Sequence, residues 1–311
     1  MLSCVVPARV TILAMTTLTA LCAGLFIVRA AEAKTNQPSA ASQVPLELRR
    51  GAALVKVRVN DSEPLAFKLD TGFGVTTIHP ELAESLGLKP AGTLTINGIA
   101  GEEKVDWLSG ATFDFGGTKY SPRRVVRIPS DAKRPRRQRD GILGSGFFRR
   151  FVVELDPVGQ TMTLHEPGSF NYAGQGEIIP LQFRRDTPTV EALIHVPDRE
   201  PLRARYEIDT GCDGALCLGH DFVKRHKLEE AVTHKRANSR TGVGGSVDTH
   251  ETRLPQFQLG TRKLDDVQAN FFREGSPVDD DLAGHIGMGV LREFKVIFDY
   301  SRRRMLLESV K

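Results

Sequence analysis

Two aspartates in this sequence occur in the same short motif, and paired carboxylates can perform acid–base chemistry. The motif is Asp70-Thr71-Gly72 in the first half of the chain and Asp209-Thr210-Gly211 in the second half, 139 residues later. Each copy follows an apolar stretch typical of a strand, and its glycine permits a tight turn. Two carboxylates about 3 Å apart cannot both ionise, so one remains a base while the other keeps a proton as an acid. The two motifs predict such a pair if the fold brings them together.

A second pair of motifs shows that the whole chain is an internal duplication. Residues 141–146, Gly-Ile-Leu-Gly-Ser-Gly, correspond to residues 284–289, Gly-His-Ile-Gly-Met-Gly, and this offset of 143 continues without a gap to Leu164 and Leu307. The repeat unit is far longer than that of a solenoid, so each unit is a domain-sized lobe. We predict a first lobe over residues 44–168 and a second over residues 177–311.

The elements that must position the motifs are predicted to be mostly strands. Residues 44–48, 54–59 and 65–69 have the composition of strands, and apolar residues alternate with polar ones in the second of them. Short helices are expected over residues 80–88 and 220–228, the first of which begins with proline. Short strands with Gly and Pro turns indicate a mostly β fold.

On these motifs the sequence resembles the pepsin and retropepsin aspartic peptidases, and in particular the small bacterial proteins with two retropepsin-like lobes. The resemblance covers residues 44 to the C-terminus and implies two pseudo-symmetric retropepsin-like β-barrel lobes in a bilobal aspartic peptidase fold. It implies that Asp70 and Asp209 meet across a pseudo-two-fold axis and activate a water molecule that hydrolyses a peptide bond. No cofactor and no metal ion is implied.

The resemblance also assigns roles to residues near the aspartates. Thr71 and Thr210 would hydrogen-bond across the axis, while Gly72 and Gly211 would shape the turns and aim their amides at the carboxylates. Two Gly-rich segments, one in each lobe, would be flap hairpins over the substrate; their expected flap residues are Gly98, Ala100, Gly101, Gly242, Gly244 and Gly245. Each segment could equally be an ordinary surface hairpin.

One position departs from pepsin, where Ser or Thr follows the glycine of the motif. Here Phe73 and Cys212 stand there, which is closer to the retropepsin pattern, and a flap tyrosine is also missing. Without a hydroxyl to stabilise the charged form, the apparent pKa values of the pair as a whole should lie above those of pepsin, giving an activity optimum at roughly pH 5 to 7. The alternative function is a non-catalytic peptide-binding protein that uses the same cleft.

Composition and motifs argue against other function classes. The formal net charge of the 311 residues is only +4, and no nucleic-acid-binding motif is present. The sequence contains no His-Glu-x-x-His zinc motif, no Gly-x-Ser-x-Gly elbow and no phosphate-binding loop. The eight histidines are scattered, which favours surface or core roles over metal binding. The expected partner is a peptide or protein substrate.

The N-terminal segment predicts export. An apolar run over residues 10–28 precedes Ala31-Glu32-Ala33, which fits a signal peptide over residues 1–33 followed by a linker over residues 34–43. The run is also long enough to span a bilayer, so an uncleaved anchor is the alternative. The mature protein would be an extracytoplasmic monomer, periplasmic or secreted. Its two cysteines, Cys212 and Cys217, could form a local disulfide or remain free thiols.

Overall fold

The computed structural model describes residues 40–98, 101–127, 139–242, 245–273, 278 and 281–310. The description below concerns the unit of residues 38–311. The predicted signal peptide and the first six residues of the predicted linker lie outside the described residues. Within these ranges no helix is both long and apolar enough to cross a membrane.

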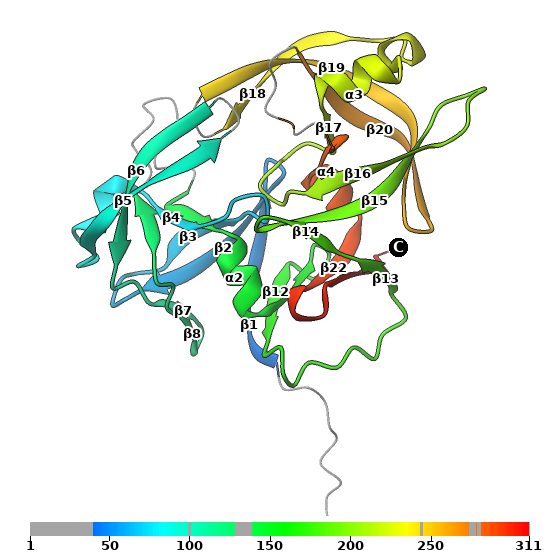
Figure 1. Ribbon diagram of the computed structural model, residues 1–311. Coiled ribbons are helices and arrows are strands. Elements are labelled where there is room, and N and C mark those ends of the chain that lie inside the picture. Colours follow the sequence, from blue (N-terminus) through cyan, green and yellow to red (C-terminus); the bar gives the residue numbers. More distant parts are fainter. Residues whose placement is uncertain are drawn as a thin grey trace, which may run out of the picture. The chain divides into compact units, whose positions relative to one another are not determined.

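The first lobe consists of short strands with two short helices among its described residues (Figure 1). Its elements are β1 (Ala40–Arg49), β2 (Ala52–Val59), β3 (Leu65–Leu69), β4 (Thr76–Ile78), α1 (Pro80–Ala83), β5 (Lys89–Gly98), β6 (Gly101–Ser109), β7 (Phe113–Phe115), β8 (Thr118–Tyr120), β9 (Val125–Arg127), β10 (Gly141–Leu143), α2 (Ser145–Arg150), β11 (Val152–Asp156) and β12 (Thr161–His165).

The second lobe has a similar order of elements. Its elements are β13 (Glu177–Pro180), β14 (Gln182–Arg184), β15 (Thr187–His195), β16 (Leu202–Ile208), β17 (Leu216–Leu218), α3 (His220–Arg225), η2 (Leu228–Ala231), β18 (Arg236–Gly242), β19 (Gly245–Leu259), β20 (Arg262–Phe272), β21 (Gly284–Ile286), α4 (Met288–Leu291), β22 (Phe294–Asp299), η3 (Tyr300–Arg302) and β23 (Arg304–Ser309).

Strand pairing confirms that the two lobes have the same architecture. In the first lobe the order β2–β3–β10–β4–β9–β6–β5 has β10 parallel to β3 and antiparallel to β4. The second lobe has the corresponding order β15–β16–β21–β17–β20–β19–β18, with β21 parallel to β16 and antiparallel to β17. A further pairing of β15 with β19 closes the second lobe into a barrel. The mostly β, two-lobe fold is therefore as predicted.

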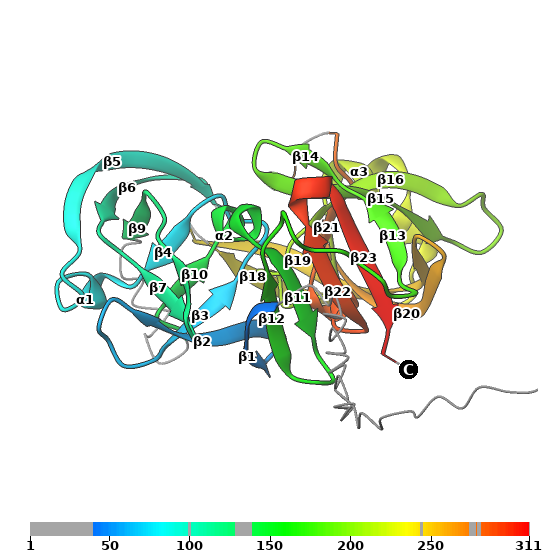
Figure 2. The same cartoon turned by 90° about the horizontal axis from the view of Figure 1, so that it is seen from below.

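A sheet built from both lobes joins them. Figure 2 shows its strands side by side in the order β13–β23–β22–β11–β12–β1. The junction is the antiparallel pair of β11 with β22, in which Glu154 lies opposite Ile297. Strand β1 begins at Ala40, so residues 40–43, predicted as linker, form the start of a strand instead. They do so because β12 offers a partner edge that sequence patterns cannot reveal.

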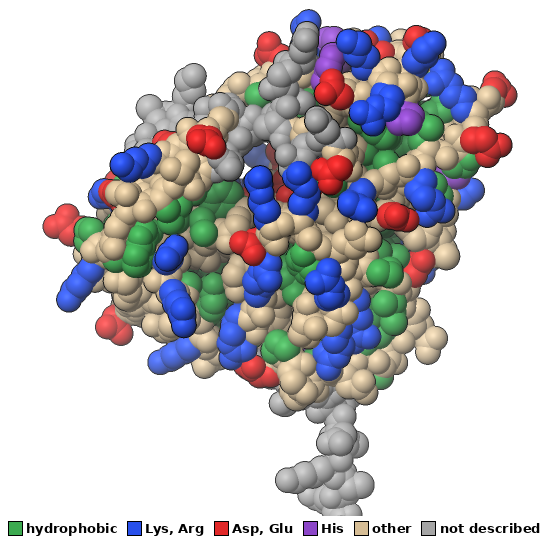
Figure 3. Space-filling view, viewed as in Figure 1, with side chains coloured by type: hydrophobic (Ala, Val, Ile, Leu, Met, Phe, Trp, Pro, Cys, Tyr) green, Lys and Arg blue, Asp and Glu red, His purple; other side chains and the backbone are tan. Residues whose placement is uncertain are grey.

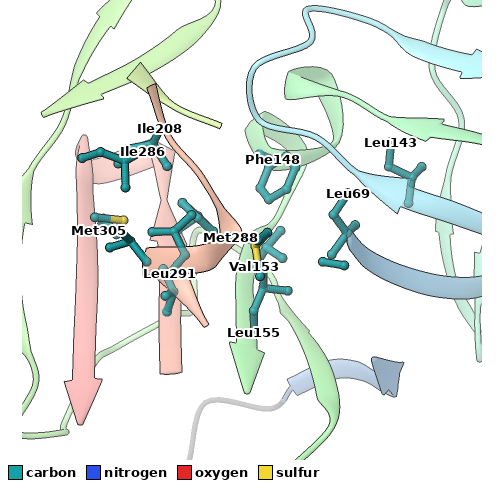
Figure 4. Packing of buried hydrophobic residues seen from close by; sticks show 14 of the residues in the cluster. Leu69, Leu143, Phe148, Val153, Leu155, Ile208, Ile286, Met288, Leu291 and Met305 are labelled. Carbon is teal, nitrogen blue, oxygen red and sulfur yellow. The ribbon is translucent and has the colours of Figure 1, made fainter. Parts of the chain in front are cut away.

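The hydrophobic core continues from one lobe into the other. Figure 4 shows Val153 and Leu155 of β11 between apolar residues of the strands that carry the two aspartates and of their parallel neighbours. On the first-lobe side these residues are Leu69 and Leu143, and on the second-lobe side Ile208 and Ile286; all four are fully buried. Each buried side chain of this size contributes about 1.5 to 3 kcal/mol relative to an exposed one. The two strand ends that carry the aspartates are thus anchored in one core.

The predicted helices are shorter than expected. Helix α1 covers only the first turn of residues 80–88, and Gly87 follows with a φ of +67° that ends the helical conformation. Helix α3 ends at Arg225, before the left-handed Lys227, and η2 follows as a separate turn. The strands expected over residues 54–59 and 65–69 are present as β2 and β3, with Val55, Val57 and Val59 buried.

Candidate functional site

The two Asp-Thr-Gly motifs occupy equivalent turns at the ends of β3 and β16. The amide of Asp70 donates to the carbonyl of Leu143 at 3.0 Å, and that of Asp209 donates to the carbonyl of Ile286 at 2.9 Å. In both lobes, therefore, the strand that carries the aspartate is tied to its parallel neighbour, β10 or β21. The repeated backbone geometry follows from the repeated sequence and delivers both carboxyl groups to one place.

The structure brings the two carboxyl groups close together. They are near enough for the charge of Asp209 to act on the pKa of Asp70 and raise it. A Cβ atom added to Gly72 would lie 2.7 Å from Cγ of Asp209, and one added to Gly211 would lie 2.2 Å from Cγ of Asp70. Each motif therefore needs glycine because the opposite carboxyl group packs against its backbone.

Hydrogen bonds between the two motif threonines cross from one lobe to the other. Oγ1 of Thr71 donates to the carbonyl of Ile208 at 2.7 Å and accepts from the amide of Thr210 at 3.0 Å. Oγ1 of Thr210 accepts from the amide of Thr71, also at 3.0 Å. Both threonines are fully buried. These bonds hold the two turns in register beneath the carboxyl groups, in the arrangement that the resemblance implied.

The residues after the two glycines have different surroundings. Phe73 packs against the first-lobe cluster of Ile96, Val105 and Val126. Cys212 contacts Cys217, with the two Sγ atoms 3.6 Å apart, and both cysteines are free thiols. The possible disulfide is therefore not formed in this structure, although the two side chains are neighbours.

The guanidinium of Arg240 supports the cysteine side of the site. Its Nη2 lies 3.7 Å from Sγ of Cys212, and it forms an ion pair with Asp213. A hydrogen bond from Cys217, with Arg240 and His285 nearby, lowers the pKa of the Cys212 thiol to about 7 although burial acts to raise it. The pKa of Cys217 is raised by the same hydrogen bond and by burial.

Three charged side chains that the sequence reasoning did not select surround the aspartates. Nδ1 of His285 lies 3.7 Å from Oδ2 of Asp209 and 3.7 Å from Oε2 of Glu207. On the other side, Nζ of Lys68 donates to the carbonyl of Gly211. The sequence did contain an indication of His285. The first lobe reads Ile142-Leu143-Gly144, and in the equivalent segment of the second lobe His285 replaces the first apolar residue. The scattered histidines were expected in surface or core roles, and this one lies beside the site.

The pKa of Asp70 is consequently raised above the usual value for aspartate, and that of Asp209 is lowered below it. Burial, followed by the charge of Asp209, raises the pKa of Asp70 to about 7 against the opposing effects of Lys68 and Arg139. Burial also acts to raise the pKa of Asp209, but the hydrogen bond and charge of His285, together with Lys68 and the Gly211 amide, hold it below its usual value. The predicted rise of the pair's apparent pKa values above those of pepsin therefore stays a prediction. His285 stabilises the ionised form of Asp209, which the missing hydroxyl cannot do.

The predicted flaps are two long hairpins, one in each lobe. Strand β5 pairs with β6 and β18 with β19, and Gly98 faces Gly101 and Gly242 faces Gly245 next to the turns. Gly101 and Gly245 have φ values of +128° and +131°, which favour glycine. Ala100 and Gly244 lie outside the described residues. Both hairpins extend along the upper side of Figure 1, and Figure 3 shows a hollow between the lobes with basic and acidic side chains at its edge.

Metal binding is not supported by the arrangement of the described side chains. Within the ranges given above, no group of three or more His, Cys, Asp or Glu residues is placed to hold a metal ion. The groups that the described residues bring to the site are two carboxyls that lie close together, one histidine, one lysine and a pair of thiols.

Comparisons with known proteins agree with this geometry. The family model for aspartyl proteases matches the chain twice, over residues 55–147 and 199–290, which places one match in each lobe. Among solved structures, the crystal structure of an aspartic proteinase from Irpex lacteus is similar in fold, with a TM-score of 0.55 and 14% sequence identity. That similarity covers 86% of this chain and 97% of the fungal chain. A search of curated proteins finds no match. The chain thus belongs to the aspartyl protease family and has its bilobal fold.

Proposed function

We propose that this protein is an aspartic endopeptidase in which Asp70 and Asp209 together activate water for peptide-bond hydrolysis. The observation that carries the proposal is that each carboxyl group packs against the glycine of the opposite motif, so that the two acids lie close together, with the pKa of Asp70 raised and that of Asp209 lowered. A general base and a general acid are then present side by side between pH 4 and pH 7, as hydrolysis of an amide requires.

The reaction follows from that pairing of ionisation states. The ionised carboxyl takes a proton from a bound water molecule as the water oxygen attacks the carbonyl carbon of the substrate. The protonated carboxyl donates its proton to the carbonyl oxygen, which gives a neutral tetrahedral intermediate without any bond between protein and substrate. Membership of the aspartyl protease family supports this chemistry over the other uses of two adjacent acids.

The sheet edges support an extended polypeptide as the substrate. Strands β5 and β18 are the terminal strands of their sheets among the described residues, and each belongs to one of the two hairpins. A peptide in extended conformation can hydrogen-bond to such an edge, which gives affinity that is independent of side chains. The expected substrate is therefore a flexible peptide or an unfolded segment of a protein.

Digestion of a mixed peptide library by matched variants tests this function. Wild type should cleave internal peptide bonds, whereas Asp70→Asn and Asp209→Asn should each be inactive and still folded by circular dichroism. Asp114→Asn, in the exposed β7–β8 hairpin, is the matched control and should cleave normally. Near-normal activity in either site variant would show that the two aspartates are not a catalytic pair. Tight peptide binding by wild type without cleavage at any pH would instead indicate the peptide-binding alternative.

A further inference from the structure

The two lobes differ in charge at one pair of equivalent positions beside the aspartates. In the first lobe, the parallel pairing of β10 with β3 places Ile142 opposite Lys68. In the second lobe, the same pairing of β21 with β16 places His285 opposite Glu207. The uncharged Ile142 beside Lys68 in the first lobe thus corresponds to His285 beside Glu207 in the second lobe. The environment of the two carboxyl groups is asymmetric although their backbone is not.

His285 is held among acidic and thiol groups from several elements. From β16 and its turn, Glu207 and Asp209 approach Nδ1 at 3.7 Å each. From β17, Cys217 lies opposite His285 in the antiparallel register, and the Cys212 thiol of the turn is also close. The side chain of His285 is 27% exposed, and those of Glu207 and Asp209 are 16% and 19% exposed. Two poorly solvated carboxylates flanking one imidazole favour the imidazolium form.

We propose that His285 is a positioning residue that, as a cation between Glu207 and Asp209, fixes Asp209 as the ionised member of the pair and leaves the shared proton on Asp70. The inference rests on the proposed function, since it assigns the base and the acid within that pair. Asp209 then draws the proton from water, and Asp70 protonates the carbonyl oxygen.

The neighbouring charges agree with this assignment. His285 contacts only Asp209 of the two aspartates in an ion pair, whereas the charge of Lys68 acts on both and cannot distinguish between them. Arg139 favours the ionised form of Asp70, but burial and the negative Asp209 outweigh it. The pKa of His285 rises to about 9, because the contacts with Asp209 and Glu207 overcome the effect of burial. His285 is accordingly a cation throughout the range in which the pair holds one proton.

Glu207 has a supporting role in this arrangement. Its pKa is raised by burial, although His285 acts in the opposite direction. A second carboxylate beside the imidazole keeps His285 protonated even when Asp209 has taken a proton from water. The proton that Asp209 accepts can then pass to the leaving amine nitrogen as the carbon–nitrogen bond breaks, while the tetrahedral intermediate returns a proton to Asp70. One water molecule is consumed, and both carboxyls end the cycle in their starting forms.

The pH profile of hydrolysis tests the role of His285. With fluorescein-labelled casein as the substrate, His285→Gln should move the acidic limb of the kcat/KM profile upward by about 1 to 3 pH units, because loss of a nearby cation raises the pKa of a carboxyl group. His285→Lys restores the positive charge and should return that limb toward its wild-type position. Ile142→Val, at the equivalent site of the first lobe, is the matched control and should leave the profile unchanged. A profile for folded His285→Gln that coincides with wild type would overturn the proposal.

A titration that needs no activity separates this inference from the proposed function. The imidazole of His285, identified in NMR spectra by its absence from His285→Gln, should titrate well above pH 7 in the inactive Asp70→Asn variant. Adding Asp209→Asn should lower its pKa by about 1 unit or more. An imidazole that titrates near its ordinary value, or one that Asp209→Asn does not affect, would overturn the inference. Normal cleavage by Asp70→Asn would instead refute the proposed function, and the titration would still decide the pairing of His285 with Asp209.

Discussion

Replacement of Thr71 by valine should destabilise the protein more than the same replacement at Thr210. Valine has nearly the shape of threonine, so the substitution removes the hydroxyl group with little change in packing. Thr71→Val leaves two buried groups without partners, the carbonyl of Ile208 and the amide of Thr210. Thr210→Val leaves only the amide of Thr71. A buried polar group without its partner costs about 1 to 3 kcal/mol, so the expected loss is about 2 to 6 kcal/mol for Thr71→Val and about 1 to 3 kcal/mol for Thr210→Val.

Urea unfolding followed by tryptophan fluorescence and circular dichroism measures this difference. A loss of about 2 to 6 kcal/mol is a large part of the typical stability of a domain, about 5 to 15 kcal/mol, and moves the midpoint of unfolding clearly. Thr71→Ser keeps the hydroxyl and should recover most of the loss. Thr189→Val is the control, because its buried hydroxyl makes only a long bond of 3.4 Å within the second lobe. If Thr71→Val cost no more than Thr189→Val, or less than Thr210→Val, the inferred cross-lobe network would be refuted.

Three further predictions follow from the site and the chain. Gly211→Ala should abolish peptide cleavage in a folded protein, because its Cβ would stand 2.2 Å from Cγ of Asp70; Gly168→Ala, with nothing within 4 Å and no left-handed backbone, should remain active, and the opposite ranking would contradict the close packing. Cleavage by wild type should decline as the pH rises through about 7, where Asp70 loses its proton, and persist below pH 5, where Asp209 is still ionised; an optimum above pH 8 would disagree. Active material should be a monomer by light scattering, and an active dimer would contradict the expected bilobal site. Its intact mass should be that of a chain starting at Lys34, and a full-length membrane-bound species would contradict the expected export.

The motifs predicted the backbone of the site because backbone geometry depends on local residue types. Asp70, Thr71 and Gly72 recur as Asp209, Thr210 and Gly211, and the turn they form needs the same short side chains in both lobes. The hairpins were predictable for the same reason, since Gly101 and Gly245 occupy conformations that favour glycine. Repetition turned a weak local signal into a prediction about tertiary structure.

The electrostatic surroundings could not be predicted, because they depend on strand register. Glu207 and His285 are far apart in the sequence and become neighbours only through the parallel pairing of β16 with β21. The sheet shared by the lobes is similar in this respect: nothing in the pattern of β11 or β22 indicates that they pair with each other. Sequence reasoning could note an unusual histidine, but only the register shows which carboxylates it meets.

At two equivalent positions near the site, the first lobe has an apolar residue and the second lobe has a polar or charged one. Counting from the equivalent glycines Gly98 and Gly242, Ile96 of β5 corresponds to Arg240 of β18. Ile96 lies in an apolar cluster against which Phe73 packs, whereas Arg240 pairs with Asp213 and contacts Cys212.

The same substitution of apolar by polar residues is seen when Ile142 is compared with His285. A homodimeric site of identical subunits would have the same groups on both sides, and its two carboxyls would have equal affinity for the shared proton. Duplication within one chain removes that constraint. The backbone that brings the carboxyls together is retained in both lobes, while the side chains around it have diverged. This divergence places an imidazole in an ion pair with Asp209 where the first lobe has Ile142, so the electrostatic surroundings of the two carboxyls differ.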